Sequence, residues 1–194
     1  MQSIITSSPY LITGLGNPGR EYRENRHNAG FMVLDRLAAR FGITFTRLES
    51  KALVTKTEYQ GQRLVLAKPQ TYMNLSGTSV SSLLRFYKVP IENLLVAYDD
   101  VDLPLGILRI RPDGGSAGQK GMVSIIERLG TDNFARLRVG IGRPPGQKDA
   151  ATYVLENFSS QELEFLSPAI DRATDAVLSF VALGLNAAMN KYNG

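Results

Sequence analysis

His27 is the only histidine in the 194-residue chain, so any chemistry that needs an imidazole depends on it. It lies in the polar segment 25–28, and the apolar residues of the helical pattern that follows begin only after Gly30. An imidazole titrates near neutral pH and can act as a general base. His27 is therefore a candidate for water activation at the rim of the core. The alternative is a capping or surface histidine.

Asp99 is a candidate partner for this imidazole. It directly follows the apolar run 94–98, so it projects from the carboxyl end of a strand that we expect to be buried on both faces. A carboxylate at this point could hold the imidazole tautomer and stabilise its protonated form, as in hydrolytic triads. Asp99, Asp100 and Asp102 could instead bind a divalent cation, but adjacent carboxylates on a strand point to opposite faces. We therefore expect no metal site.

Asn17 belongs to a glycine-rich loop, Gly14-Leu15-Gly16-Asn17-Pro18-Gly19, that follows a short strand. The glycine spacing matches a dinucleotide-binding motif, but that motif needs a helix that begins within it, and Pro18-Gly19 favours a turn. No strand ending in an acidic residue follows about twenty positions later, since Asp35 lies in a helical pattern. Asn17 instead offers an amide, with donors and an acceptor, where open α/β sheets bind ligands.

The composition excludes several classes of protein. The chain has no cysteine, which rules out disulfides, thiolate metal sites and cysteine nucleophiles and suits a reducing cytosol, so we expect a cytoplasmic protein. The weakly polar stretch 176–189 is too short to span a bilayer and is expected to be a buried helix, so no membrane association is expected. Residues 1–8 contain no basic residue and no sustained apolar run, unlike a signal peptide, although a processed organellar precursor stays possible.

Positive charge is concentrated in one part of the chain. The formal net charge is +4, but residues 107–148 contain eight Lys and Arg against three Asp and Glu, a surplus of five. The rest of the chain is therefore close to neutral. A local basic surface of this kind is typical of proteins that bind a polyanion such as a nucleic acid. The alternative is a solvated face of a mildly basic protein.

The order of the expected elements predicts an α/β fold. Helical spacing of apolar residues predicts helices over 28–41, 76–87 and 118–129, and short apolar runs predict strands over 10–13, 53–59, 62–67, 94–98, 108–111 and 137–141. A capping box, Ser159-Ser160-Gln161-Glu162, begins the last long helix, which Pro168 is expected to interrupt or restart with Ser167 as a new cap. We expect a single-domain three-layer sandwich over residues 1–194, with a mixed, mostly parallel sheet flanked by helices and with residues 1–9 as a flexible tail.

Five blocks of residues, in order, resemble the bacterial-type peptidyl-tRNA hydrolases, and together they cover about residues 10–190. The first block joins the glycine loop, Tyr22 and the segment Asn25-Arg26-His27-Asn28-Ala29-Gly30. The others are Lys68-Pro69-Gln70-Thr71-Tyr72-Met73-Asn74-Leu75-Ser76-Gly77, Tyr98-Asp99-Asp100-Val101-Asp102-Leu103-Pro104, Gly114-Gly115-Ser116-Ala117-Gly118 with Gly121, and Arg136-Leu137-Arg138-Val139-Gly140-Ile141-Gly142.

The resemblance implies a reaction and the residues that perform it. These enzymes hydrolyse the ester between a peptide and the 3′ ribose of tRNA, without a metal or cofactor, and a monomer with no obligate protein partner is the family expectation. By the family pattern His27 activates water, Asp99 orients His27, and Asn17 helps to hold the water or the peptide. Further substrate contacts are expected at Tyr22, Met73, Asn74 and Lys120, and contacts to the tRNA phosphate at Arg111 and Arg138.

One departure from the family pattern concerns Gln119-Lys120, where many relatives carry His-Asn. Lys120 has three donors and no acceptor, so the role of the Asn is not transferred unchanged. Lys120 could instead hold a phosphate or a developing oxyanion. The main alternative function is a catalytically silent RNA- or protein-binding factor on the same fold, resembling plastid group II intron splicing factors, since a fold does not fix a function. A third alternative, a nucleotide-dependent enzyme, is supported only by the spacing of the glycines in residues 14–19.

Overall fold

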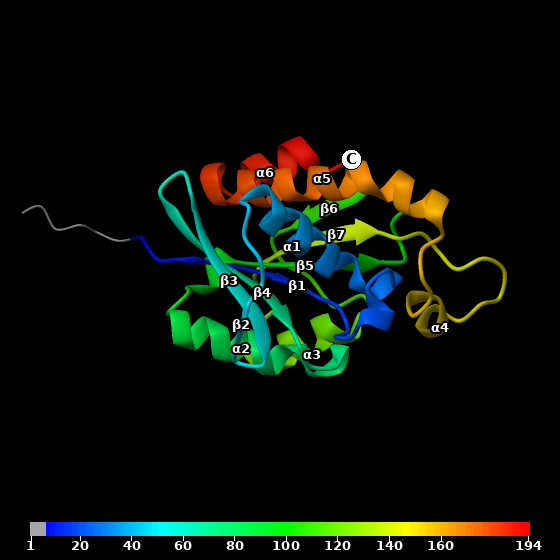
Figure 1. Cartoon of the computed structure of the whole chain (residues 1–194), viewed down its shortest axis with the longest axis horizontal. Helices are drawn as coiled ribbons and strands as arrows, with labels where there is room; N and C mark the ends of the chain where they lie inside the picture. The colour runs from blue at the N-terminus through cyan, green and yellow to red at the C-terminus, as the bar shows by residue number, and fades with distance from the viewer. Residues whose placement is uncertain (1–6) are drawn as a thin grey trace, which may run out of the picture.

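The computed structural model describes residues 7–194, so residues 1–6 of the expected tail lie outside the described part of the chain. Within residues 7–194 seven strands form one sheet in the order β2-β3-β4-β1-β5-β7-β6 (Figure 1). The strands are β1 Tyr10–Gly14, β2 Arg47–Glu49, β3 Ala52–Tyr59, β4 Gln62–Pro69, β5 Leu94–Asp100, β6 Leu108–Arg111 and β7 Ala135–Gly140. The helices are α1 Ala29–Arg40, α2 Ser76–Tyr87, α3 Lys120–Leu129, α4 Ala150–Val154, α5 Ser160–Leu183 and α6 Leu185–Tyr192.

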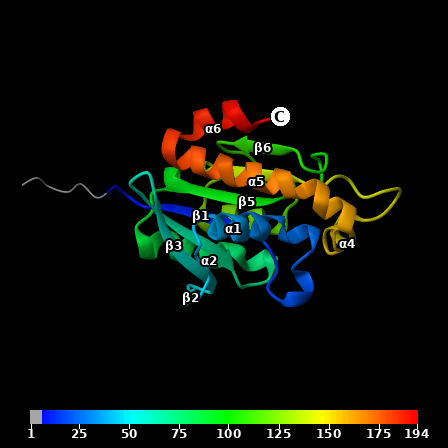
Figure 2. The ribbon, with the colours of Figure 1, turned by 45° about the horizontal axis from the view of Figure 1, so that its top comes forward.

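The four central strands β4, β1, β5 and β7 are parallel, and the outer pairings β2–β3, β3–β4 and β6–β7 are antiparallel. The predicted α/β fold with a mixed sheet between layers of helices is confirmed. Helices α1, α5 and α6 cover one face, and α2 and α3 cover the other (Figures 1 and 2). The parallel strands end at one edge, where β1 and β5 lie side by side. Open α/β sheets bind their ligands at this edge.

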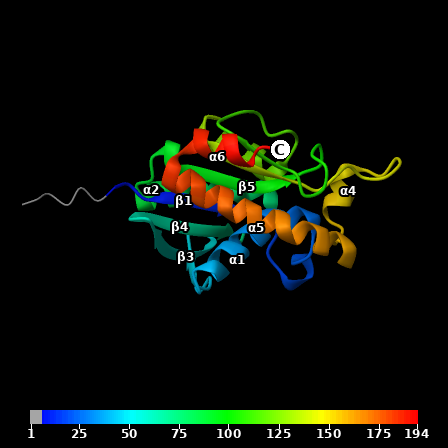
Figure 3. The same cartoon turned by 90° about the horizontal axis from the view of Figure 1, so that it is seen from above.

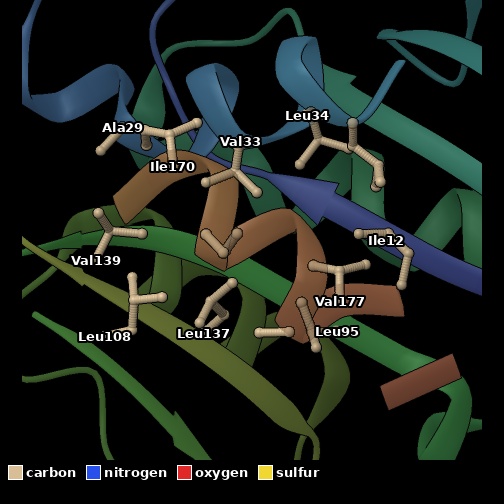
Figure 4. Close-up of a cluster of buried hydrophobic side chains, with 14 of the residues drawn as sticks. Ile12, Ala29, Val33, Leu34, Leu95, Leu108, Leu137, Val139, Ile170 and Val177 are labelled. Atoms are coloured by element: carbon tan, nitrogen blue, oxygen red, sulfur yellow. The ribbon is translucent and has the colours of Figure 1, made fainter. Parts of the chain in front are cut away.

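Successive side chains of the central strands point to opposite faces of the sheet, and each face has its own hydrophobic core. Leu11 and Val96 belong to the cluster under α2 and α3, whereas their neighbours Ile12 and Leu95 belong to the cluster under α1 and α5. Figure 4 shows the second cluster, in which Ile12 and Leu95 meet Val177 of α5. Because successive side chains of a strand point to opposite faces, a strand covered on both sides is apolar over most of its length. All seven residues of β5 are buried, as this arrangement requires.

Helix α5 corrects the prediction for Pro168. The capping box is present, with Ser159 accepting from the backbone of Glu162, but the helix continues through Pro168 to Leu183. Proline in a helix interior costs about 3 kcal/mol, whereas a fully buried Leu, Ile or Val contributes roughly 1.5–3 kcal/mol. The apolar face of α5 crosses the sheet beside α1 (Figure 3) and buries several such side chains, including Ile170 and Val177. Burial therefore outweighs the lost hydrogen bond.

The stretch 176–189 also differs from its prediction as one buried helix. Gly184 adopts φ 88° and ends α5, so that Leu185–Tyr192 forms the separate helix α6. The short elements β2 and α4 were not predicted, because three to five residues are too few to show a period. Within residues 7–194 no helix is long and apolar enough to cross a membrane.

Candidate active site

A cavity of about 620 Å³ opens at the carboxyl edge of β1 and β5. Its size is in the range of small-ligand sites. Six residues predicted from the sequence line it together: Asn17, His27, Met73, Asn74, Asp99 and Lys120. Three others do not line it. Tyr22 ends a short 3₁₀ segment outside the cavity, and Arg111 and Arg138 lie on β6 and β7.

His27 and Asp99 form a buried pair at the cavity wall. The Nδ1 atom of His27 lies 2.9 Å from Oδ2 of Asp99, although the two residues are 72 positions apart in sequence. Only 7% of His27 and 3% of Asp99 is exposed. A carboxylate can only accept a hydrogen bond, so in the neutral ring Nδ1 carries the proton and Nε2 has the lone pair. Within residues 7–194 no hydroxyl group is hydrogen bonded to the ring, so this geometry suits activation of a water molecule.

Polar contacts to the chain that follows α4 anchor the two residues before His27. Asn25 donates from Nδ2 to the carbonyl of Leu155 at 2.6 Å. Arg26 is 7% exposed, donates to the carbonyl of Asn157 at 2.9 Å, and binds the carboxylate of Glu162 at 3.0 Å. These contacts fix the backbone directly before His27. The alternative of a surface histidine therefore does not fit the buried position of His27.

Replacing Glu162 with glutamine is expected to lower the free energy of unfolding by about 2 kcal/mol at pH 7. Arg26 would lose the charge of its nearer carboxylate partner, since Glu162 lies at 3.0 Å and Glu156 at 3.8 Å. Partial burial raises the pKa of Glu162, but hydrogen bonds from the Ser159 backbone and from Arg26 outweigh it and hold the pKa below the ordinary value. The stabilisation is therefore complete above the unfolded-state pKa, roughly 4.3, and is lost as the pH falls through the lower folded-state pKa.

Urea unfolding of both proteins across this pH range measures the effect. Glu164 is exposed on the same helix and forms no ion pair within residues 7–194, so Glu164→Gln is the matched control and should differ little from the parent. A difference between Glu162→Gln and the parent that stays constant from pH 7 down to about pH 3 would contradict the assigned linkage.

The glycine loop packs against α1 and leaves no place for a pyrophosphate. A Cβ added to Gly14 would lie 2.2 Å from the carbonyl oxygen of Gly30, and one added to Gly16 would lie 2.6 Å from the ring of Phe31. The first two glycines of the motif therefore allow close packing of the loop on α1. The loop is followed by the 3₁₀ segment Arg20–Tyr22 rather than by a long helix. These contacts account for the glycine spacing without a dinucleotide.

Asn17 is held so that its amino group is left for a ligand. Its Oδ1 accepts from the backbone N–H of Met73 at 3.1 Å, and its backbone is bonded in both directions to the side chain of Asn28, at 2.8 and 3.0 Å. Since the oxygen is used, Nδ2 is the group that Asn17 offers to the cavity. Asn74, directly after Met73, is exposed and adds a second amide.

The three aspartates of 99–102 do not converge. Asp99 binds His27, whereas Asp100 forms an ion pair with Nε of Arg138 and accepts from the backbone N–H of Asp102 at 2.8 Å. Asp102 itself lies near Arg143, at 3.2 Å. Adjacent carboxylates thus take partners on opposite faces of β5, as strand geometry requires. Within residues 7–194 no group of three or more His, Cys, Asp or Glu side chains is arranged to hold a metal ion.

Four arginines form two cross-strand pairs on β6 and β7. Arg109 lies opposite Arg138, and Arg111 lies opposite Arg136. Like charges directly opposite each other in a sheet are destabilising, so this arrangement suits a surface that binds an anion. Arg136 is an exception, because it is 1% exposed and donates to the carbonyls of Gly114 and Asp132. Burial lowers the pKa of its guanidinium.

Gln119 is a site residue that sequence reasoning missed. It is 8% exposed, lines the cavity and donates to Asp99 at 3.1 Å. The departure at Gln119-Lys120 was the available signal, but a sequence does not show which of two neighbouring side chains turns inward. Lys120 is the first residue of α3, exposed at the cavity, and forms no ion pair within residues 7–194.

An α/β sheet with a buried His–Asp pair and two asparagine amides at its carboxyl edge suits a hydrolase that activates water. The chain belongs to the peptidyl-tRNA hydrolase family, because the family model described as peptidyl-tRNA hydrolase matches residues 11–194.

Known proteins similar to this chain agree with that assignment. It is 48% identical to a peptidyl-tRNA hydrolase of Thermoanaerobacter sp. (strain X514), over 95% of this chain and 100% of that protein. It is 50% identical to one of Chloroflexus aggregans, over 95% of this chain and 98% of the relative. The crystal structure of peptidyl-tRNA hydrolase from Acinetobacter baumannii has a TM-score of 0.90 and 37% identity, covering 97% of this chain and 96% of that one. A methylthioadenosine nucleosidase of Arabidopsis thaliana, at 11% identity and a TM-score of 0.53, shares the fold alone.

Proposed function

We propose that this protein hydrolyses the ester between a peptide and the 3′ ribose of tRNA with His27 as the general base and Asp99 as the residue that orients it. The activity, release of peptide from tRNA, follows from the family to which the chain belongs. The roles of the residues are supported by one observation, the 2.9 Å contact between His27 Nδ1 and Asp99 in the wall of the cavity.

In the proposed mechanism Nε2 of His27 takes a proton from a water molecule in the cavity, and the water oxygen attacks the ester carbonyl. The tetrahedral intermediate then breaks the bond to the 3′ oxygen, which takes the proton from the imidazolium as it leaves. Asp99 stabilises the positive ring between these two steps. One positioned base contributes about 10²–10⁴-fold to a rate, which suits the leaving group of an ester.

The remaining cavity residues suit recognition of peptide and ester groups. Nδ2 of Asn17 and the amide of Asn74 can bind main-chain oxygens, which every peptide has, so recognition does not depend on the peptide sequence. The ammonium of Lys120 can stabilise the oxyanion or a terminal phosphate. Met73, which is 4% exposed, forms an apolar part of the cavity wall. A contact of Tyr22 with substrate stays a prediction, and so do the cytoplasmic location and the monomeric state.

Arg109, Arg111 and Arg138 of β6 and β7 lie outside the cavity and suit the phosphates of the tRNA end. Arg138 uses Nε for Asp100, which leaves its two terminal amino groups for a ligand. Arg111 is exposed. Replacing Arg111 with alanine is expected to weaken tRNA binding roughly five- to tenfold at low salt and to reduce the slope of log K against log salt by about 1.

Filter binding or fluorescence anisotropy at several salt concentrations measures both quantities. Arg85 provides the matched control, since it is also exposed but lies in the last turn of α2, which packs on β1 and β4 rather than on β6 and β7. Equal losses in Arg111→Ala and Arg85→Ala would show that only net charge matters and would contradict the phosphate assignment.

The activity itself is tested with an N-blocked aminoacyl-tRNA in the presence of EDTA, by following release of the blocked amino acid. Multiple turnovers support the proposal. Tight tRNA binding without release would contradict it and would favour the catalytically silent binding factor. Loss of turnover on addition of EDTA, restored by a divalent cation, would contradict a mechanism that depends on His27 and water alone.

A further inference from the structure

We propose that Gln119 is a positioning residue that holds the Asp99 carboxylate for His27. This inference rests on the proposed function. The observation that carries it is that both oxygens of Asp99 have side-chain partners, His27 Nδ1 on Oδ2 at 2.9 Å and Gln119 Nε2 on Oδ1 at 3.1 Å. Asp99 is thus held between the base and the first turn of α3.

The orientation of the Gln119 amide is set by α3. Its oxygen accepts from the backbone N–H of Met122 at 2.8 Å, as the N-cap of the helix. A backbone N–H can only donate, so the amide oxygen must face Met122 and the amino group must face Asp99. The same nitrogen, Nε2, lies 3.4 Å from Sδ of Met73, which accepts the second amino hydrogen. The side chain is 8% exposed, and both of its amino hydrogens and its oxygen have a partner.

The second contact removes a freedom that the His–Asp pair alone would leave. The torsion that turns a carboxylate about its last bond is broad, so a single partner does not fix its plane. With Gln119 on Oδ1, Oδ2 keeps its direction toward Nδ1 of His27, and Nε2 stays directed at the cavity. Supporting hydrogen bonds of this kind around reactive groups are worth roughly 10- to 100-fold where they orient metal ligands. We expect an effect toward the lower end of that range here.

Three substitutions separate this role from helix capping. Gln119→Ser keeps an N-cap oxygen but removes the donor to Asp99, Gln119→Met removes both, and Gln119→His offers one donor and one acceptor. We expect kcat to fall roughly tenfold in the Ser and Met variants with little change in KM, and most of the loss to be recovered in the His variant. Gln161→Ser, at an exposed position of α5, is the matched control for the substitution itself.

A loss of kcat in Gln119→Met with parental kcat in Gln119→Ser would show that only the cap matters, and would overturn the proposal. In an Asp99→Ala background Gln119→Ser should cost no more than about twofold, because a residue that acts through Asp99 has nothing left to position. A full additive loss in that background would also overturn it.

A measurement independent of turnover separates this inference from the proposed function. Since His27 is the only histidine, ¹⁵N-histidine labelling gives the NMR signals of one imidazole. We expect the parent to show the Nδ1–H tautomer and a hydrogen-bonded ring proton, and Gln119→Ser to show a weakened proton signal or a mixture of tautomers. An unchanged ring spectrum would overturn the role of Gln119 even if hydrolysis is confirmed. If the spectrum changes but the parent protein does not hydrolyse its substrate, the positioning contact is supported and the proposed reaction is contradicted.

Discussion

His27→Ala is expected to lower kcat for hydrolysis of an N-blocked aminoacyl-tRNA by about 10²–10⁴-fold, the contribution of a positioned general base. No second imidazole exists in the chain to replace it. The variant should still bind tRNA, because the arginines of β6 and β7 lie on other strands than Asp99 and outside the cavity. Single-turnover kinetics at saturating enzyme measure the chemical step directly.

Two further measurements keep the interpretation of His27→Ala specific. Thermal unfolding shows whether the loss is structural, since removal of the ring leaves Asp99 buried without its partner. Added imidazole should recover part of the lost rate, because His27 lies in the wall of a cavity that is large enough to admit it. A parental rate in this variant would remove His27 from the mechanism.

Asp99→Asn is expected to lower kcat by about 10²–10⁴-fold while the fold is kept, because it changes the tautomer of His27. An asparagine has one accepting and one donating end. Since Gln119 Nε2 needs an acceptor, the amide oxygen would face Gln119 and the amino group would face Nδ1 of His27. Nδ1 must then accept, and the proton lies on Nε2, the atom that should take a proton from water.

Asp102→Asn is the matched control for this substitution. Asp102 is three residues further along, its side chain is 50% exposed, and its ion-pair partner Arg143 is 78% exposed. A solvated pair of this kind contributes little, so a change of no more than about twofold is expected. The ¹⁵N spectrum of His27 in Asp99→Asn should show the Nε2–H tautomer. Retention of the Nδ1–H tautomer together with a large loss of kcat would contradict this account of Asp99.

Local pattern was sufficient for most of the fold. The central strands consist mostly of apolar residues because helices cover both of their faces. The spacing of apolar residues predicted α2 with the bounds that the structure shows, Ser76–Tyr87. The candidate base and its partner were also predicted, since a lone histidine beside a glycine loop and an aspartate at a strand end both mark the carboxyl edge of a sheet. These predictions of position depend only on neighbours in the chain, and the structure places both residues in the wall of the cavity.

Long-range packing decided the rest. Pro168 remains within α5 because the free energy gained by burying the apolar face of the helix exceeds the cost of proline in its interior. The residues near Pro168 in the sequence indicate that cost but not the burial. The pairing of β1 with β5 brings residues 72 positions apart to within 2.9 Å. Gln119, and not Lys120, reaches Asp99, because the N-cap geometry of α3 turns one side chain inward and leaves its neighbour exposed. The chemistry could be assigned from residue types, whereas its orientation depends on contacts between segments that are distant in the chain.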